Sequence, residues 1–170
     1  MKTEQKNLTR KLAAAGVLTA VAVVGSTLGF PVAGSKCAPV QHMVNILASV
    51  MLGPAWSVGI AFCASLLRNL TGLGSLMAFP GSMVGALLCG LVCRYTGSLK
   101  LTCVAEAFGT GVLGGIAAYP VAKYIVGSAP AGLFIYVVPF LISTVCGSII
   151  AGVVIALLQR SGAFKRLHQL

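Results

Sequence analysis

Six apolar runs follow one another through the chain, and several carry polar side chains that hydrocarbon does not solvate. The sequence has 170 residues, of which 58% are hydrophobic and 8% charged, a composition typical of an integral membrane protein. We therefore predict one membrane-embedded substrate-binding domain over residues 1–170, an all-α bundle of six transmembrane helices. The predicted spans are residues 12–30, 40–52, 55–70, 76–95, 101–126 and 133–158.

The second run is too short to cross a bilayer core of about 30 Å unaided, since at about 1.5 Å per residue it reaches only roughly 20 Å. We expect it to start irregularly or to be sheltered by neighbouring helices. The Gly- and Pro-rich segment 31–39 before it cannot be a helix. His42, Asn45 and Ser49 fall within about 60° of one helical face, which indicates a shared polar environment.

The distribution of Lys and Arg predicts that both termini are cytoplasmic. With six spans the termini share one side, and only Lys36, Arg68 and Lys123 then lie outside or in the outer half of the bilayer. The net charge of +10 thus reflects topology. The basic residues form no stripe that would indicate nucleic acid. The other basic residues, on the cytoplasmic side, are Lys2, Lys6, Arg10, Lys11, Arg94, Lys100, Arg160, Lys165 and Arg166.

The N-terminus resembles a signal peptide, because basic residues precede an apolar run. That run is longer than a typical signal-peptide core, and further apolar runs follow it. Lys36 before Cys37 also argues against a lipoprotein-type cleavage site. We therefore expect an uncleaved first helix.

Enzyme chemistry fits the sequence poorly. It has no paired carboxylates and no GxSxG, HExxH or P-loop motif, which argues against hydrolysis, metal catalysis and ATP turnover by this chain. The six cysteines lie mostly in apolar runs without a CxxC pair, as expected of buried thiols. We predict no catalytic residue, no bound metal and no cofactor on this chain.

Polar and aromatic side chains within the apolar runs indicate a small-molecule site in the outer half of the bilayer. The alternatives stay open: the polar residues can lie at the membrane–water boundary, and each aromatic ring can serve ordinary packing. Arg68 and Lys123 can neutralise Glu106 or extend to lipid headgroups. The predicted substrate-binding residues are Gln41, His42, Asn45, Arg68, Phe79, Glu106, Tyr119 and Tyr136.

Glu106 is the one acid within the apolar runs, and it can either carry protons or cap a hydrogen-bond network. Two other functions therefore remain: a stand-alone proton-coupled secondary transporter of a small neutral metabolite, and an intramembrane enzyme that uses His42 or Glu106. The runs show no evident internal repeat, which weakens the first. No second catalytic group is recognisable for the second.

The first run has small residues four positions apart, Gly16 and Ala20. This spacing lets a second helix approach closely in lipid. It predicts a helix-docking face.

Four strings identify a family. PVQHMVNILASVMLGP, SLLRNLTGLGSLMAFPGSMVGALLCGL, EAFGTG and AAYPVAK closely resemble the ThiW family, the thiazole-type substrate-binding S-components of energy-coupling factor transporters. The resemblance implies six membrane helices, a pocket near the outer face, and hydroxyethylthiazole, a thiamine precursor, as ligand. It also implies a membrane coupling protein and two ATPase subunits as partners, with ATP used only by the ATPases. In related S-components an AxxxA face on the first helix meets the coupling protein, and Gly16 and Ala20 occupy the matching positions here.

Overall fold

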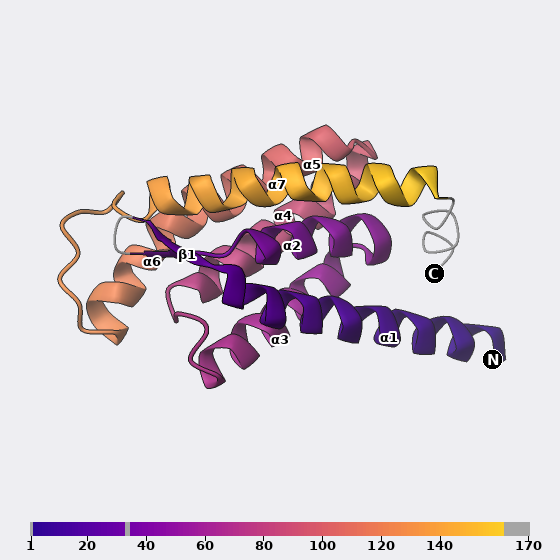
Figure 1. The fold of residues 1–170 in the computed structure, drawn as a ribbon, viewed down its shortest axis with the longest axis horizontal. Coiled ribbons are helices and arrows are strands. Elements are labelled where there is room, and N and C mark those ends of the chain that lie inside the picture. Colours follow the sequence, from indigo (N-terminus) through magenta and orange to yellow (C-terminus); the bar gives the residue numbers. More distant parts are fainter. Residues whose placement is uncertain (1, 33–34, 162–170) are drawn as a thin grey trace.

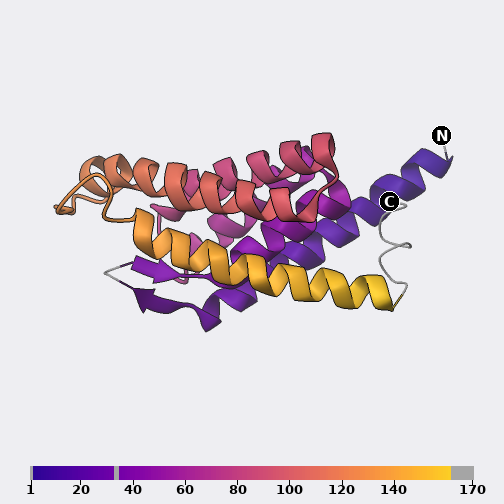
Figure 2. The same ribbon diagram turned by 90° about the horizontal axis from the view of Figure 1, so that it is seen from above.

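The computed structural model describes residues 2–32 and 35–161. In it α1, α2, α3, α4, the continuous helical segment Leu99–Ile125 and α7 run in alternate directions (Figure 1). The start of α1 and the end of α7 lie at the same end of the molecule (Figures 1 and 2). Lys165 and Arg166, which contribute to the charge asymmetry, lie outside the described residues. The elements are α1 (Lys2–Gly25), η1 (Ser26–Leu28), β1 (Phe30–Val32), β2 (Ser35–Cys37), α2 (Pro39–Leu52), α3 (Pro54–Leu70), α4 (Ala78–Thr96), α5 (Leu99–Glu106), η2 (Ala107–Gly114), α6 (Gly115–Pro120), η3 (Val121–Ile125) and α7 (Val137–Arg160).

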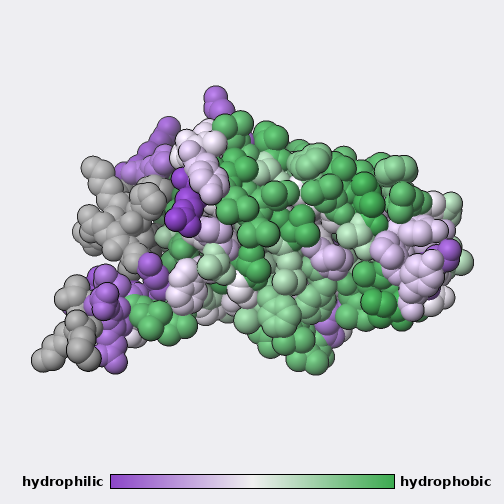
Figure 3. Space-filling view, turned by 180° about the vertical axis from the view of Figure 1, so that it is seen from behind, coloured by the Kyte–Doolittle hydropathy of each residue, from purple (hydrophilic) through white to green (hydrophobic). Residues whose placement is uncertain are grey.

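The helical architecture is confirmed, and four helices of the described part are long and apolar enough to cross a membrane. These are Glu4–Leu28, Ala78–Thr96, Leu99–Ile125 and Val137–Arg160. Figure 3 shows an apolar surface over the middle of one face, with hydrophilic residues gathered towards both ends. Six crossings remain a prediction, because α2 with 14 residues and α3 with 17 are not among these four helices. The cytoplasmic location of the termini also remains a prediction.

The segment before α2 is non-helical, as predicted, but it contains two short strands that we did not predict. β1 and β2 pair antiparallel, with Phe30 opposite Cys37 and Val32 opposite Ser35. The strand pairing satisfies backbone N–H and C=O groups in the segment before α2, which is too short for a helix. This hairpin is the one departure from an all-α fold among the described elements.

The helical segment from Leu99 to Ile125 switches from α-helical to π-helical hydrogen bonds twice. A π-helical stretch, η2, follows directly after Glu106, and a second, η3, follows Pro120. The proline, which cannot donate a backbone hydrogen bond, loosens the helix without ending it. The stretch after Glu106 was not predicted, although π-helical turns are frequent at functional sites.

Glycines let α4 and η2 approach closely. A Cβ built on Gly81 would lie 3.2 Å from the Cα of Gly114, and one built on Gly109 would lie 2.9 Å from the Cα of Gly85. Larger side chains at these positions would push the helices apart. The contact places the start of α4 against Glu106 and Thr110.

The last helix begins later than predicted. Residues 133–136 form a turn, and α7 starts at Val137. The turn lets the buried Tyr136 ring pack with Ala118, Ala122 and Phe140.

Candidate functional site

The first half of α2 points its polar side chains into the bundle. Gln41, His42 and Asn45 are all buried, and Pro39 sits at the first position of the helix, where its missing N–H is not needed. Val44, Ile46 and Leu47 of the same helix belong to the apolar core. The predicted polar face of this helix is therefore an interior face.

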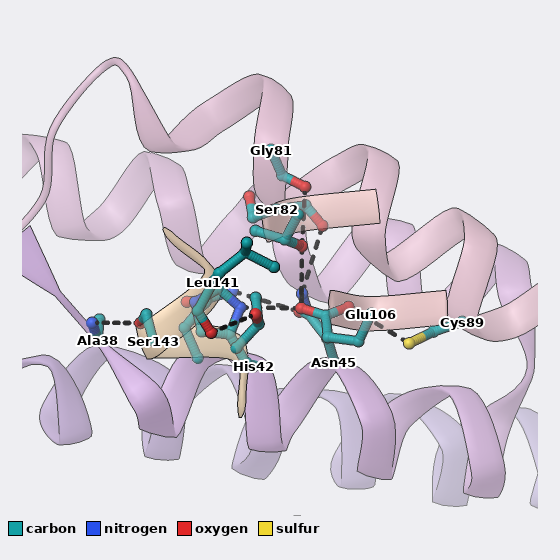
Figure 4. A network of polar contacts seen from close by, with 12 residues as sticks. Ala38, His42, Asn45, Gly81, Ser82, Cys89, Glu106, Leu141 and Ser143 are labelled. Atoms are coloured by element: carbon teal, nitrogen blue, oxygen red, sulfur yellow. Dashed lines mark hydrogen bonds and ion pairs between the residues drawn. The ribbon is translucent and has the colours of Figure 1, made fainter. Parts of the chain in front are cut away.

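Glu106 is fully buried and lies at the centre of the polar network (Figure 4). Its Oε1 atom lies 2.8 Å from His42 Nδ1, 3.1 Å from Asn45 Nδ2 and 3.0 Å from Thr110 Oγ1. The Cys89 thiol donates to Oε2 over 3.3 Å. Four donors surround the carboxyl group: two from α2, one from α4, and Thr110 from η2, which continues the helix of Glu106.

The His42–Glu106 contact bears on which ring nitrogen of His42 carries a proton. An ionised carboxylate only accepts hydrogen bonds, so beside such a group Nδ1 would carry a proton and donate it to Oε1. In the neutral ring, Nε2 is then an acceptor, and in the protonated ring it is a donor. His42 can thus meet either kind of ligand group.

Gly85 leaves the space that this network occupies. A Cβ at this position would overlap Thr110 Oγ1 and lie 2.8 Å from Glu106 Oε2. The closely packed α4–η2 contact and the buried carboxylate thus depend on the same glycine.

A chain of hydrogen bonds connects Glu106 to Arg68. The guanidinium Nη1 of Arg68 donates to Gln41 Oε1 over 3.1 Å, and Gln41 Nε2 donates to Asn45 Oδ1 over 3.4 Å. Asn45 Nδ2 in turn donates to Glu106. All donors point the same way, from the cation towards the anion, so each bond polarises the next.

A small cavity of about 30 Å³ lies on the side of the network nearest the hairpin. A second space of about 20 Å³ shares four of its wall residues, Lys36, Arg68, Ala78 and Phe140. The wall of the first combines charged, polar and aromatic groups from β2, α2, α3, α4, η2 and α7. Its residues are Lys36, Ala38, Gln41, His42, Arg68, Ala78, Ser82, Thr110, Phe140 and Ser143.

The hairpin closes this cavity through three contacts with other elements. Lys36 Nζ donates to the Leu73 carbonyl over 3.1 Å, and the backbone N–H of Ala38 donates to Ser143 Oγ over 2.9 Å. The Cys37 thiol donates to the Pro139 carbonyl over 3.1 Å. Burial, followed by the nearby Cys146, raises the pKa of Cys37, so the thiol keeps the proton that it donates.

The structure brings five of the eight predicted site residues together. Gln41, His42 and Arg68 line the cavity, while Asn45 and Glu106 lie behind them in the network. The predicted aromatic residues lie elsewhere. Phe79 packs edge-on against Phe62 at 6.0 Å, Tyr136 packs beside Phe140 at 6.4 Å, and Tyr119 lies under Lys123 at 5.9 Å.

Sequence reasoning missed Phe140 and Ser143 as wall residues. They lie in the first two turns of a helix whose residues are apolar on every side, so no periodic signal marks an inward face. Lys36 was also missed, because its place in the wall depends on the hairpin. Thr110 was missed as well, although it lies about one helical turn after Glu106.

Neither Arg68 nor Lys123 forms an ion pair with Glu106 in the part of the chain that the structure describes. Within residues 2–32 and 35–161 the ion pair that the structure shows is His42–Glu106. Arg68 is buried, whereas Lys123 is exposed and lies over the rings of Tyr119 and Tyr124.

A second hollow lies between α1 and α3 and is almost entirely apolar. It has a volume of about 710 Å³. Gly16 and Ala20 are exposed and line it together with Gly59 and Trp56. A Cβ on Gly16 or Gly59 would meet nothing within 4 Å. The predicted docking face is therefore open, and we call it the α1–α3 groove.

Comparison with protein families gave one finding. Residues 12–161 match the family model described as thiamine-precursor transporter protein (ThiW). Searches of curated proteins and of solved structures gave no match.

Proposed function

Since the chain belongs to the ThiW family of thiamine-precursor transporters, we propose that it is the substrate-binding membrane subunit of an energy-coupling factor transporter that imports hydroxyethylthiazole. The observation that carries this proposal is the cavity walled by Gln41, His42, Arg68 and Phe140. It offers hydrogen-bond donors, an acceptor and an aromatic ring, which suit a thiazole with a hydroxyl arm. With cytoplasmic termini, the cavity faces the outside of the cell.

The cavity must widen to admit a thiazole, because about 30 Å³ is the volume of roughly one water molecule. The hairpin and the residue after it are held to the rest of the wall by hydrogen bonds from Lys36, Cys37 and Ala38. The wall residues on α2 and α4 are fixed by the buried network. We therefore place the movement in the cover.

Partners supply the energy in this proposal. The chain carries no P-loop, so two ATPase subunits would hydrolyse the ATP. A membrane coupling protein would transmit the energy to this chain. The α1–α3 groove supports this, since Gly16 and Ala20 leave an apolar surface open to an approaching helix.

Ligand identity is tested by thermal unfolding of the detergent-solubilised protein. Hydroxyethylthiazole should raise the unfolding temperature, because a ligand that binds only the folded state stabilises it by mass action. Thiamine, which is larger and cationic, should raise it much less. A larger shift with thiamine or with a pyrimidine precursor would contradict the assigned ligand.

His42 provides the matched test of the site. His42→Ala should weaken thiazole binding by about tenfold to a hundredfold, as expected for an unmade buried hydrogen bond. Tyr119→Leu, outside the wall, serves as the control and should change affinity by less than about twofold. Equal effects of the two variants in calorimetric titration would place the site elsewhere.

The second candidate function is a stand-alone proton-coupled transporter, and the buried His42–Glu106 pair is the observation that favours it. The two functions differ in what uptake requires. Reconstituted alone in vesicles with a proton gradient, the chain should accumulate no thiazole. Uptake should appear when the coupling protein, both ATPases and ATP are added.

A further inference from the structure

Arg68 is a buried cation with little to balance it. Its side chain is 4% exposed, and it lies near the end of α3, inside the bundle. Ionised groups placed there are costly unless they are paired. Arginine does not escape this cost by losing its proton.

No acid is available to pair with this guanidinium. The whole chain contains two acids, Glu4 and Glu106. Glu106 is occupied by His42, Asn45, Thr110 and Cys89, and Glu4 lies near the start of α1, at the end of the molecule that carries the termini (Figure 1). The one protein acceptor of Arg68 among the described residues is the neutral amide oxygen of Gln41.

The unpaired part of Arg68 is the part that binds anions. Gln41 takes Nη1, while Nε is buried and has no partner in the described part of the chain. Nε and Nη2 together form one edge of the guanidinium fork, which binds the two oxygens of a carboxylate or phosphate side by side. Arg68 lines both small cavities, and Lys36 lines them with it.

We propose that Arg68, with Lys36 beside it, binds an anionic group of the transported molecule, so that the preferred ligand is an acidic thiazole such as the phosphate ester of hydroxyethylthiazole. This inference rests on the proposed function and specifies the substrate class of the same site. A phosphate would satisfy the free edge of Arg68 and neutralise a wall that contains two cations and no acid. A neutral alcohol would leave the cation unbalanced.

Calorimetric titration of the purified chain in phosphatidylcholine nanodiscs tests the proposal. The probes are hydroxyethylthiazole, its phosphate ester and inorganic phosphate. The ester should bind at least about tenfold more tightly than the alcohol, the effect expected of a charge-assisted hydrogen bond. Arg68→Gln should abolish this preference, and Arg68→Lys, which keeps the charge without the fork, should retain part of it.

Lys123→Gln is the matched control, because it removes an exposed cation that does not line the cavity. It should leave the preference for the ester unchanged. Equal affinity of the alcohol and the ester in the unmodified chain would overturn the proposal, even though thiazole binding as such would survive. A preference for the ester that persists in Arg68→Gln would also overturn it.

Two further measurements distinguish the remaining outcomes of this experiment. If neither thiazole binds, the proposed function fails, and Arg68-dependent binding of inorganic phosphate then decides whether the anion site exists. In nanodiscs that contain phosphatidylglycerol, an Arg68-dependent rise in unfolding temperature without any ester would assign the anion to a lipid headgroup and overturn the proposal.

Discussion

Glycines have opposite roles in the two regions that we assign to ligand and to partner. In the contact between α4 and η2, Gly81, Gly85 and Gly109 bring backbones together around a buried carboxylate. In the α1–α3 groove, Gly16 and Gly59 face open space. The first region is polar and closed, and the second is apolar and open. The same residue type thus completes a packed interior in one place and leaves a surface unfilled in the other.

The comparison predicts that the closed region responds to substitution through stability and the open region through assembly. Glu106→Ala should have the largest effect. It leaves His42 Nδ1 without its acceptor and removes one of the two acceptors of Asn45 Nδ2 and of the Cys89 thiol. Breaking a buried ion pair costs about 3–5 kcal/mol. Chemical denaturation in detergent measures this change in unfolding free energy. Glu4→Ala, at an exposed acid, should stay within about 0.5 kcal/mol, and a similar small loss at Glu106 would mean that the network is not structural.

Particular residues show how much of the closed region could be predicted from the sequence. His42, Asn45 and Glu106 could be singled out because polar groups in apolar runs are rarely placed at random. Their direct contact could not be predicted, because Glu106 is 64 residues from His42 and no periodicity reports contacts between helices. The π-helical stretch after Glu106 and the hairpin have no local signature either, since both arise from packing against neighbouring elements.

The helices themselves were easier to predict than the cavity. The apolar runs 40–52, 55–70 and 76–95 locate α2, α3 and α4 to within a few residues. The wall of the cavity draws on residues from six elements, and Phe140 lies on a helix that is apolar on all sides. Local sequence can therefore give the elements, whereas the wall depends on which faces meet.

Two glycine substitutions, one in each region, measure the difference between the closed and the open region. Gly85→Ala should destabilise the protein by about 1–3 kcal/mol, the usual cost of overpacking an interior, because the new methyl group would overlap Thr110 Oγ1. Gly16→Ala should change stability by no more than about 0.5 kcal/mol. Both are measured by the same denaturation experiment, and equal losses would show that Gly16 is packed internally.

The open groove should show its effect in transport. Gly16→Trp fills the α1–α3 groove and should reduce uptake by at least about tenfold, equivalent to about 1.4 kcal/mol, in cells that carry the coupling protein and ATPases. Thiazole binding to the isolated chain should persist, because Gly16 is not in the cavity wall. Parallel loss of binding and uptake would contradict a docking role.

The smallest predicted effect separates the two regions by their aromatic residues. Phe140 is the aromatic residue in the cavity wall, and Trp56 lines the groove. An aromatic contact adds about 0.5–1.5 kcal/mol beyond the area it buries, so Phe140→Leu should weaken thiazole binding about threefold to tenfold while the side chain still fills much of the space. Trp56→Leu should leave affinity within about twofold. Isothermal titration of the two folded variants measures both affinities. A weaker ligand affinity in Trp56→Leu than in Phe140→Leu would reverse the assignment. It would place the thiazole in the groove and leave the polar cavity as a purely structural network.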